Sequence, residues 1–157
     1  MKFRVSDEVE APAGWVWEGF TDFTFIEAEA LANGADLTRM GGWAEPRVGA
    51  SWHGAVQVRG KVRPIEAQVS AFLPPEALAI QTRIGGMQCR YEVALDPLAT
   101  AVTRVSVMLE LSAATMSAKL LLQSMKVARR RVHQRLEGAV VRQGQEVERA
   151  WRLRAQS

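Results

Sequence analysis

The chain has 157 residues, of which 48% are hydrophobic and 24% charged, with a formal net charge of +3. This composition is typical of a globular domain with a core of its own and excludes a disordered chain. A single cysteine, Cys89, excludes an internal disulfide, and no apolar run approaches the ~20 residues of a membrane span. Because charged residues lie where a signal peptide needs an apolar core, we expect a cytoplasmic protein and one domain over residues 1–157.

Charge is distributed unevenly along the chain. From residue 115 onward, ten Lys and Arg stand against three Glu, which gives +7, whereas ten Lys and Arg and fourteen Asp and Glu give residues 1–114 a charge of −4. A basic segment packed on an acidic body explains this division, and so does an anionic partner for that segment. We favour the first explanation and expect two of the three arginines at 129–131 to face solvent.

The N-terminal part predicts a strand followed by two short helices. Apolar residues alternate with polar ones in the strand at Phe3, Val5 and Val9, and Asp7 falls on the same phase. Pro12 is well placed to open the first helix. Thr24 and Glu27 have the spacing of a capping box for the second helix, which we expect to end at Asn33-Gly34.

Residues 36–111 predict a meander of six antiparallel strands. The first runs from Asp36 to Trp43 and includes the turn signal Gly41-Gly42, and Pro46 and Gly49 mark the break after it. Five alternating runs follow, separated by Gly60-Lys61, Pro74-Pro75, Gly85-Gly86 and Asp96-Pro97. We expect their inward positions to be Trp52, Gly54, Val56 and Val58; Ile65, Ala67, Val69, Ala71 and Leu73; Leu78, Ile80, Thr82 and Ile84; Met87, Cys89, Tyr91, Val93 and Leu95; and Val105, Val107, Leu109 and Leu111.

The last quarter of the chain predicts one long amphipathic helix, from Thr115 to Trp151. Its apolar stripe recurs mostly at steps of three or four, at Leu121, Met125, Ala128, Val132, Leu136, Val140 and Val147. Such a helix is roughly 50 Å long at 1.5 Å per residue. It is therefore expected either to project beyond the body or to bend at Gly138 or Gly144.

The order of these elements resembles the START-like superfamily, also called SRPBCC, which includes polyketide cyclases and aromatases, lipid-transfer domains and pollen-allergen-like proteins. The resemblance spans nearly the whole chain and rests on Ala11-Pro12 with Val16-Trp17, on Gly49-Ala50-Ser51-Trp52, and on Leu95-Asp96-Pro97 before Thr103-Arg104-Val105. It implies an α+β helix-grip fold, in which a curved antiparallel sheet wraps around a long C-terminal helix. It also implies a cavity for an apolar ligand between the sheet and that helix.

Polar residues on the inward phase are the candidate ligand contacts. A buried polar group needs a partner, water or a wet cavity, so Tyr91, Thr82, Asp7 and Arg63 predict a polar end to an apolar pocket. A shifted phase at Asp7 and a solvent-reaching Arg63 are the structural alternatives. The apolar candidates for the cavity wall are Val56, Val69, Ile80, Val107 and Met125.

Other sites of chemistry are weakly indicated. His53 and His133 are expected at the surface, Cys89 in the core, and the five tryptophans in packing; no motif for a metal, nucleotide or other cofactor is present. The basic helix from Lys119 to Arg142 has no aromatic residue, which argues against nucleic-acid binding and leaves peripheral contact with an anionic membrane open.

Three functions remain. The sequence favours binding or transport of a small hydrophobic molecule, such as a lipid, isoprenoid or polyketide-like compound. An alternative is an enzyme of the cyclase or aromatase type, with Asp7, Arg63 and Tyr91 as candidate acid or base groups. It is disfavoured because no pair of titratable groups is clearly placed together. A third is an accessory protein that docks on a larger complex through residues 142–154.

Overall fold

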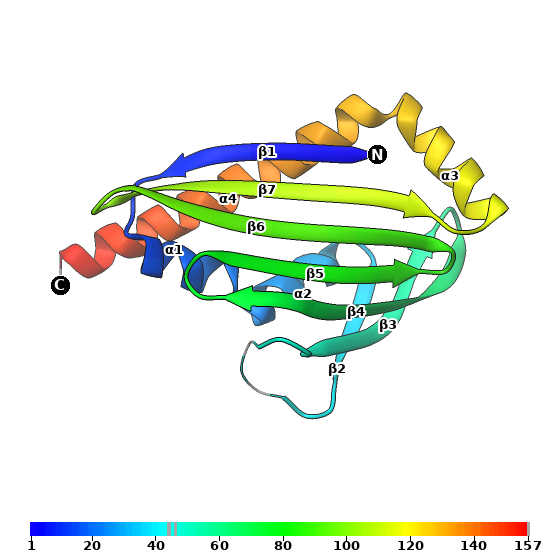
Figure 1. The fold of residues 1–157 in the computed structure, drawn as a ribbon, viewed down its shortest axis with the longest axis horizontal. Coiled ribbons are helices and arrows are strands. Elements are labelled where there is room, and N and C mark those ends of the chain that lie inside the picture. Colours follow the sequence, from blue (N-terminus) through cyan, green and yellow to red (C-terminus); the bar gives the residue numbers. More distant parts are fainter. Residues whose placement is uncertain (44, 46, 157) are drawn as a thin grey trace.

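The computed structural model describes residues 1–43, 45 and 47–156, and its main feature is a curved antiparallel sheet (Figure 1). Its seven strands are β1 (Lys2–Val9), β2 (Ala35–Met40), β3 (Ser51–Val58), β4 (Lys61–Leu73), β5 (Ala77–Ile84), β6 (Met87–Ala99) and β7 (Val102–Ala113). Their order is β1-β7-β6-β5-β4-β3-β2, so β2 to β7 form a meander and β1 joins it beside β7. The six-strand meander predicted from the alternation is confirmed.

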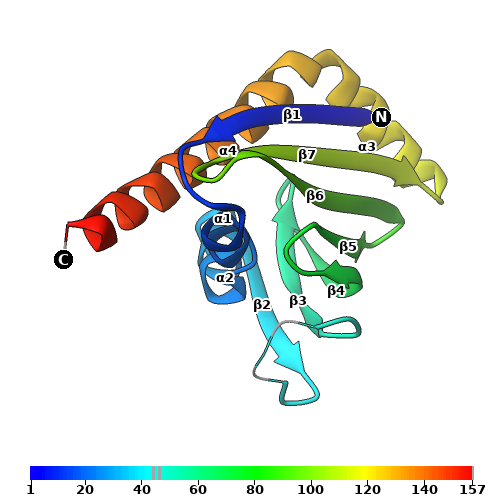
Figure 2. The ribbon, with the colours of Figure 1, turned by 60° about the vertical axis from the view of Figure 1, so that its left-hand side comes forward.

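Four helices accompany the sheet: α1 (Ala13–Phe20), α2 (Phe23–Ala32), α3 (Met116–Val127) and α4 (Arg129–Ala155). Helices α1, α2 and α4 lie on the concave side of the sheet, and the C-terminal end of α4 projects beyond it (Figure 2). Helix α4 contacts β1 and α1, α2 contacts β2, and α3 contacts β7. This is the predicted α+β helix-grip arrangement.

The two short helices fold as their local sequence indicates, with one difference at a cap. Val16, Trp17 and Phe20 form the buried side of α1. Helix α2 is capped by Asp22, whose carboxylate accepts a hydrogen bond from the Phe25 amide at 3.2 Å. The predicted Thr24–Glu27 capping box is therefore wrong, because the Asp22 cap starts the helix one residue before Thr24.

The C-terminal segment forms two helices, where one was predicted, and the bend lies at Ala128 and at neither glycine. The Ala128 amide bonds to Met125 O at 3.0 Å, a tight turn in place of the α-helical bond. Just beyond it, the Arg129 guanidinium donates to Lys2 O at 2.7 Å and lies over the Phe3 ring, 5.0 Å from its centroid. We attribute the bend to this tertiary contact, which directs α4 along β1.

Three strand boundaries differ from the sequence prediction. The turn between β3 and β4 is formed by Arg59 and Gly60, both with positive φ, one residue earlier than expected. The first strand of the meander ends at Met40, so Trp43 lies beyond it. Strand β6 continues through Pro97, although proline lacks an amide N–H. This is possible because β5 pairs with β6 only as far as Ala94, so no neighbouring strand on that side requires a hydrogen bond from residue 97. The break predicted at Pro46 lies outside the described residues.

An irregularity in β4 also changes the inward set. The pairing with β5 shifts between Val69 and Ala71, so Phe72 turns toward the core and its ring lies 5.4 Å from that of Trp17. Leu73, predicted to face inward, is 60% exposed. A one-residue shift exchanges the two faces of a strand, which is the physical reason for this correction.

Candidate functional site

The concave face of the sheet is packed unevenly along its length. Toward α1 it is filled by a core that includes Val69, Val93, Val105 and Val107, each no more than 2% exposed. Toward α3 and the β3–β4 turn, Ile65, Met87 and Leu111 are buried as well, but a set of other inward side chains is only half-buried: Val56, Val58, Thr82, Ile84, Cys89, Tyr91 and Leu109. Apolar side chains that point inward and still keep free surface indicate unfilled space beside them.

Tyr91 and Cys89 lie at the middle of this less filled half. Cys89 pairs with Thr82 and Tyr91 with Ile80 across β5 and β6, so the phenol, the thiol and the Thr82 hydroxyl are neighbours on one face. Burial raises the pKa of Tyr91 to about 12 and the pKa of Cys89 to about 11. Removal from water disfavours the charged forms of both groups, so the phenol and the thiol are neutral at physiological pH. Within the described part of the chain, no group hydrogen-bonds the Tyr91 hydroxyl.

Arg63 lies on the same face, close to the β3–β4 and β5–β6 turns. It follows the inward phase of Ile65 on β4 and pairs with Val56 of β3. Its Nε is buried and has no hydrogen-bond partner among the described residues, while Nη1 lies 3.7 Å from the position that a Cβ on Gly85 would take. The guanidinium therefore lies between two hairpin turns with hydrogen-bonding capacity to spare.

Asp7 faces α4 and is separated from the other three polar candidates. Its Oδ2 would lie 3.3 Å from a Cβ on Gly144, and burial together with the charges of Glu148, Glu8 and Glu137 raises its pKa. Asp7 pairs with Val105, whereas Tyr91 pairs with Leu109, four residues further along β7. At about 3.3 Å per residue the two groups lie roughly 13 Å apart along the strands.

The remaining sequence candidates divide between buried and half-buried positions. Val69, Ile80 and Val107 are buried in the core, whereas Val56 and Met125 are half-buried. Of the other residues singled out, His53 is exposed as expected. His133, expected at the surface, is half-buried on α4, and both of its ring nitrogens are buried without a hydrogen bond.

A polar cluster that the sequence did not reveal joins α2 to the sheet. The Glu27 carboxylate accepts hydrogen bonds from Arg39 Nε at 2.7 Å, from Arg39 Nη2 at 3.0 Å and from Trp52 Nε1 at 2.7 Å. The Arg39 guanidinium lies 4.5 Å from the centroid of the Trp43 ring, and Trp43 and Trp52 meet edge to face. Burial alone would raise the pKa of Glu27, but the hydrogen bonds from Arg39 and Trp52 outweigh it and hold the pKa below its ordinary value. Each residue is ordinary in the sequence, and only the fold brings them together.

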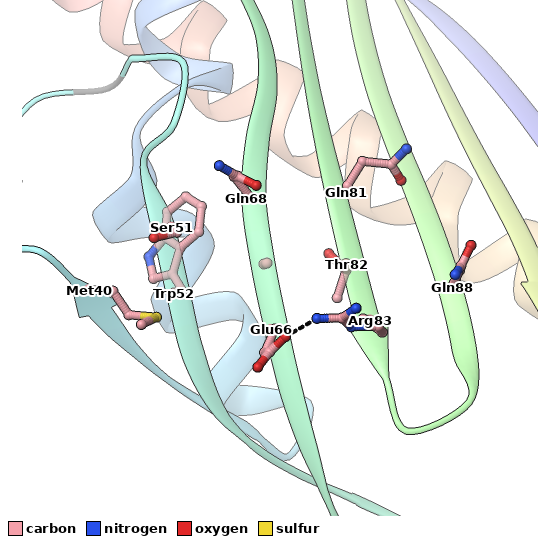
Figure 3. A pocket seen from close by; sticks show the side chains of 10 residues that line it. Met40, Ser51, Trp52, Glu66, Gln68, Gln81, Thr82, Arg83 and Gln88 are labelled. Carbon is pink, nitrogen blue, oxygen red and sulfur yellow. Dashed lines mark hydrogen bonds and ion pairs between the residues drawn. The ribbon is translucent and has the colours of Figure 1, made fainter.

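A depression of about 510 Å³ lies on the opposite, convex face of the sheet (Figure 3). Glu66, Gln68, Gln81, Arg83 and Gln88 stand around it, and Glu66 and Arg83 form an ion pair. The side chains of that pair are 60% and 64% exposed. This surface is a solvated polar face, so an apolar ligand would gain little by binding there.

The part of the chain that the structure describes contains no group of three His, Cys, Asp or Glu side chains arranged as metal ligands. Nor does it contain a helix with the length and apolar character of a membrane span.

The curved seven-stranded sheet, the two short helices after β1 and the long C-terminal helix define the helix-grip fold of START-like proteins. Comparison with solved structures agrees. The protein TTHA0849 from Thermus thermophilus superposes with a TM-score of 0.67 at 15% identity, over 96% of this chain and 99% of that one. The Zhui aromatase/cyclase from Streptomyces sp. R1128 gives 0.64 at 17% identity, over 95% and 94%. A START superfamily protein from Mycobacterium smegmatis gives 0.53 at 16% identity, over 88% and 98%.

No protein-family profile matches the sequence, and no curated protein matches it. The resemblance inferred from the sequence is thus confirmed at the level of the fold.

Proposed function

We propose that this chain, as a single START-like domain, binds or transports a small hydrophobic molecule between the concave face of its sheet and helices α3 and α4. The observation that carries the proposal is the half-buried state of inward side chains around Tyr91 and Cys89, deep inside the protein. An apolar ligand that filled this space would gain about 0.8 kcal/mol for each CH₂ removed from water. A lipid, an isoprenoid or a polyketide-like compound has the required character.

Polar groups at two places would orient the ligand. The Tyr91 hydroxyl and the Thr82 hydroxyl lie on neighbouring strands and suit a hydroxyl or carbonyl group. Arg63, close to the β3–β4 and β5–β6 turns, suits an anionic or strongly polar head. A molecule with an apolar body and a polar end fits this arrangement, and exchange of such a molecule with a membrane surface is part of the proposal.

The arrangement supports binding better than acid–base catalysis. Asp7 and Tyr91 are roughly 13 Å apart along the strands by the 3.3 Å rise per residue. Tyr91 is in register with Val69 of β4 through Ile80 of β5. Arg63 is six residues from Val69 along β4, so Arg63 and Tyr91 are roughly 20 Å apart along the strands by the same rise. A general acid and a general base must both lie within hydrogen-bond distance of the reacting group of the substrate. Asp7, Tyr91 and Arg63 are too far apart to meet this requirement.

The primary experiment is native mass spectrometry of the purified protein, followed by denaturing extraction of bound material. A stoichiometric apolar compound is the expected result. An empty protein whose thermal midpoint is also unchanged by a panel of fatty acids, isoprenoids and aromatic polyketides would refute the proposal.

A cavity-filling substitution gives an independent test. In Cys89→Phe the added ring would occupy the free space, so we expect weaker binding of a fluorescent fatty-acid probe with little loss of stability. The matched variant Val107→Phe enlarges a residue that is 2% exposed and should cost about 1–3 kcal/mol by overpacking. Equal destabilisation by both variants would mean that the space beside Cys89 is already filled.

A further inference from the structure

Helix α3 carries an exposed apolar stripe that nothing in the described fold covers. Met116, Leu120 and Val127 are 73%, 67% and 92% exposed, respectively. Their spacings of four and seven residues place them on one side of the helix, while the opposite side, with Ala118, Leu121 and Met125, faces the body. Single exposed apolar residues are common, but three aligned along one helix form a contact surface.

Lysines border this stripe without carboxylate partners. Lys119 and Lys126 lie along one flank of α3, and none of the ion pairs among the described residues includes either of them. The sequence from 111 to 136 has no Asp or Glu and six Lys or Arg. A shallow hollow of about 580 Å³ at the bend extends the cationic surface from Lys126 and Val127 to Arg129 and Arg130.

The β3–β4 turn reaches the same end of the molecule. Arg59, at the turn, hydrogen-bonds Ser124 Oγ on α3, so the turn and the helix meet at this end of the concave face. Val62, just after the turn, is 67% exposed. The exposed apolar residues and the cations therefore surround the end where inward side chains keep free surface.

We propose that α3 and the β3–β4 turn form a membrane-docking surface, which inserts Met116, Leu120 and Val127 among anionic lipids while Lys119 and Lys126 contact their headgroups. An apolar stripe bordered by lysines is the composition of helices that lie in a membrane interface, and each basic residue near an anionic surface adds to the attraction. The inference rests on the proposed function, because docking would bring the ligand-binding face close to a membrane that supplies or receives an apolar ligand.

Charge and composition favour a lipid surface over other occupants. A second copy of the chain would bring two identical cationic segments together, and their repulsion opposes that contact. A nucleic acid would be expected to contact aromatic side chains, and residues 115–142 contain none. An acidic protein would satisfy the lysines but gives no reason for the exposed stripe.

The test is co-sedimentation of the full chain with vesicles of phosphatidylcholine, with and without roughly one-third phosphatidylglycerol, a share that gives the surface a negative potential. We expect binding to the anionic vesicles only, and release when salt rises from about 0.1 M to about 1 M, where screening shortens to about 3 Å. Lys126→Glu should weaken the partition at least tenfold, roughly as two units of charge imply. Leu120→Ser should weaken it by roughly fivefold to tenfold through lost insertion.

Two matched controls carry the same changes elsewhere. Arg47→Glu reverses an exposed charge in the loop before β3, and Leu31→Ser removes a side chain on α2 that is 61% exposed. Both should bind anionic vesicles as the unaltered protein does, and all four variants should keep its thermal midpoint. Equal loss in the controls, or no binding by the unaltered protein, would overturn the inference.

Other outcomes separate the alternatives. If Leu120→Ser binds normally while Lys126→Glu does not, the contact is electrostatic adsorption and the inserted stripe is refuted. A dimer in solution that Leu120→Ser dissolves, without vesicle binding, would assign the stripe to self-association instead. Binding of the fatty-acid probe without vesicle binding would refute this inference alone, and vesicle binding by a protein that takes up no apolar ligand would refute the proposed function alone.

Discussion

Replacing Glu27 by Gln should weaken the attachment of α2 to the sheet. The carboxylate accepts three hydrogen bonds, two from Arg39 and one from Trp52, and its side chain is 21% exposed. Gln keeps the size but removes the charge, and its amide has one oxygen to accept where the carboxylate has two. Hydrogen bonds to charged groups contribute about 1.5–3 kcal/mol each, and three that share one group are not additive.

Because both partners retain some solvent, we expect a loss at the low end of this range, about 1.5–2 kcal/mol in the free energy of unfolding. For a domain of this size, each kcal/mol shifts the thermal midpoint by ~2–4 °C, so the midpoint should fall by about 3–8 °C. Urea unfolding followed by tryptophan emission reports directly on the cluster, since Trp43 and Trp52 are part of it. Glu29→Gln is the matched control on the same helix, and its exposed side chain predicts a change within about 0.5 kcal/mol.

The difference between the two proteins should depend on pH. The folded-state pKa of Glu27 lies below its ordinary value of 4.5, so its stabilising effect is fully present above pH 4.5 and is lost as the pH falls through the folded-state pKa. A loss below about 0.5 kcal/mol at neutral pH, within the usual range of surface changes, would refute the reasoning. So would a difference that stays constant down to strongly acidic pH.

Two further substitutions test local features. Asp7→Asn should raise the thermal midpoint at neutral pH, because burial and neighbouring carboxylates disfavour the charged form of Asp7. Thermal scans at several pH values should show that this gain vanishes below pH 3.8, where the Asp7 carboxyl is protonated in the folded and the unfolded protein. Gly54→Ala should cost more than about 3 kcal/mol, because a Cβ there would overlap the Asp36 carbonyl. Hydrogen exchange should then show early opening of β2, whereas Gly14→Ala, with nothing within 4 Å, should leave it protected.

Local pattern was sufficient to predict most of the fold. The strands were predictable because one face of each is buried and the alternation records it. The bend at Ala128 was not, since it depends on Arg129 reaching β1, a contact between residues 127 positions apart. The inward position of Phe72 in place of Leu73 could not be predicted either, because the sequence of β4 gives little indication of a bulge.

The candidate site was predictable only in part. The inward phase placed Thr82, Tyr91 and Arg63 on the concave side, and their roles as ligand contacts stay predictions. The same phase included Asp7, but its carboxylate lies against Gly144 of α4 and away from the other candidates. That position depends on where α4 packs, which the strand pattern does not indicate. The Glu27 cluster depends on how α2 crosses the sheet, for which the spacing of its residues gives no sign.

The position of β1 has a consequence for how the chain reaches its native state. Phe3 pairs with Leu109, and the Met1 ammonium donates to Leu111 O at 2.9 Å, across 110 residues. Closing a loop of that length costs entropy before any contact repays it, so such pairing forms late. During synthesis β1 leaves the ribosome before β7 and has no partner strand in the sheet until β7 has been made. A refolding experiment should accordingly find the protection of β1 amides among the last to develop.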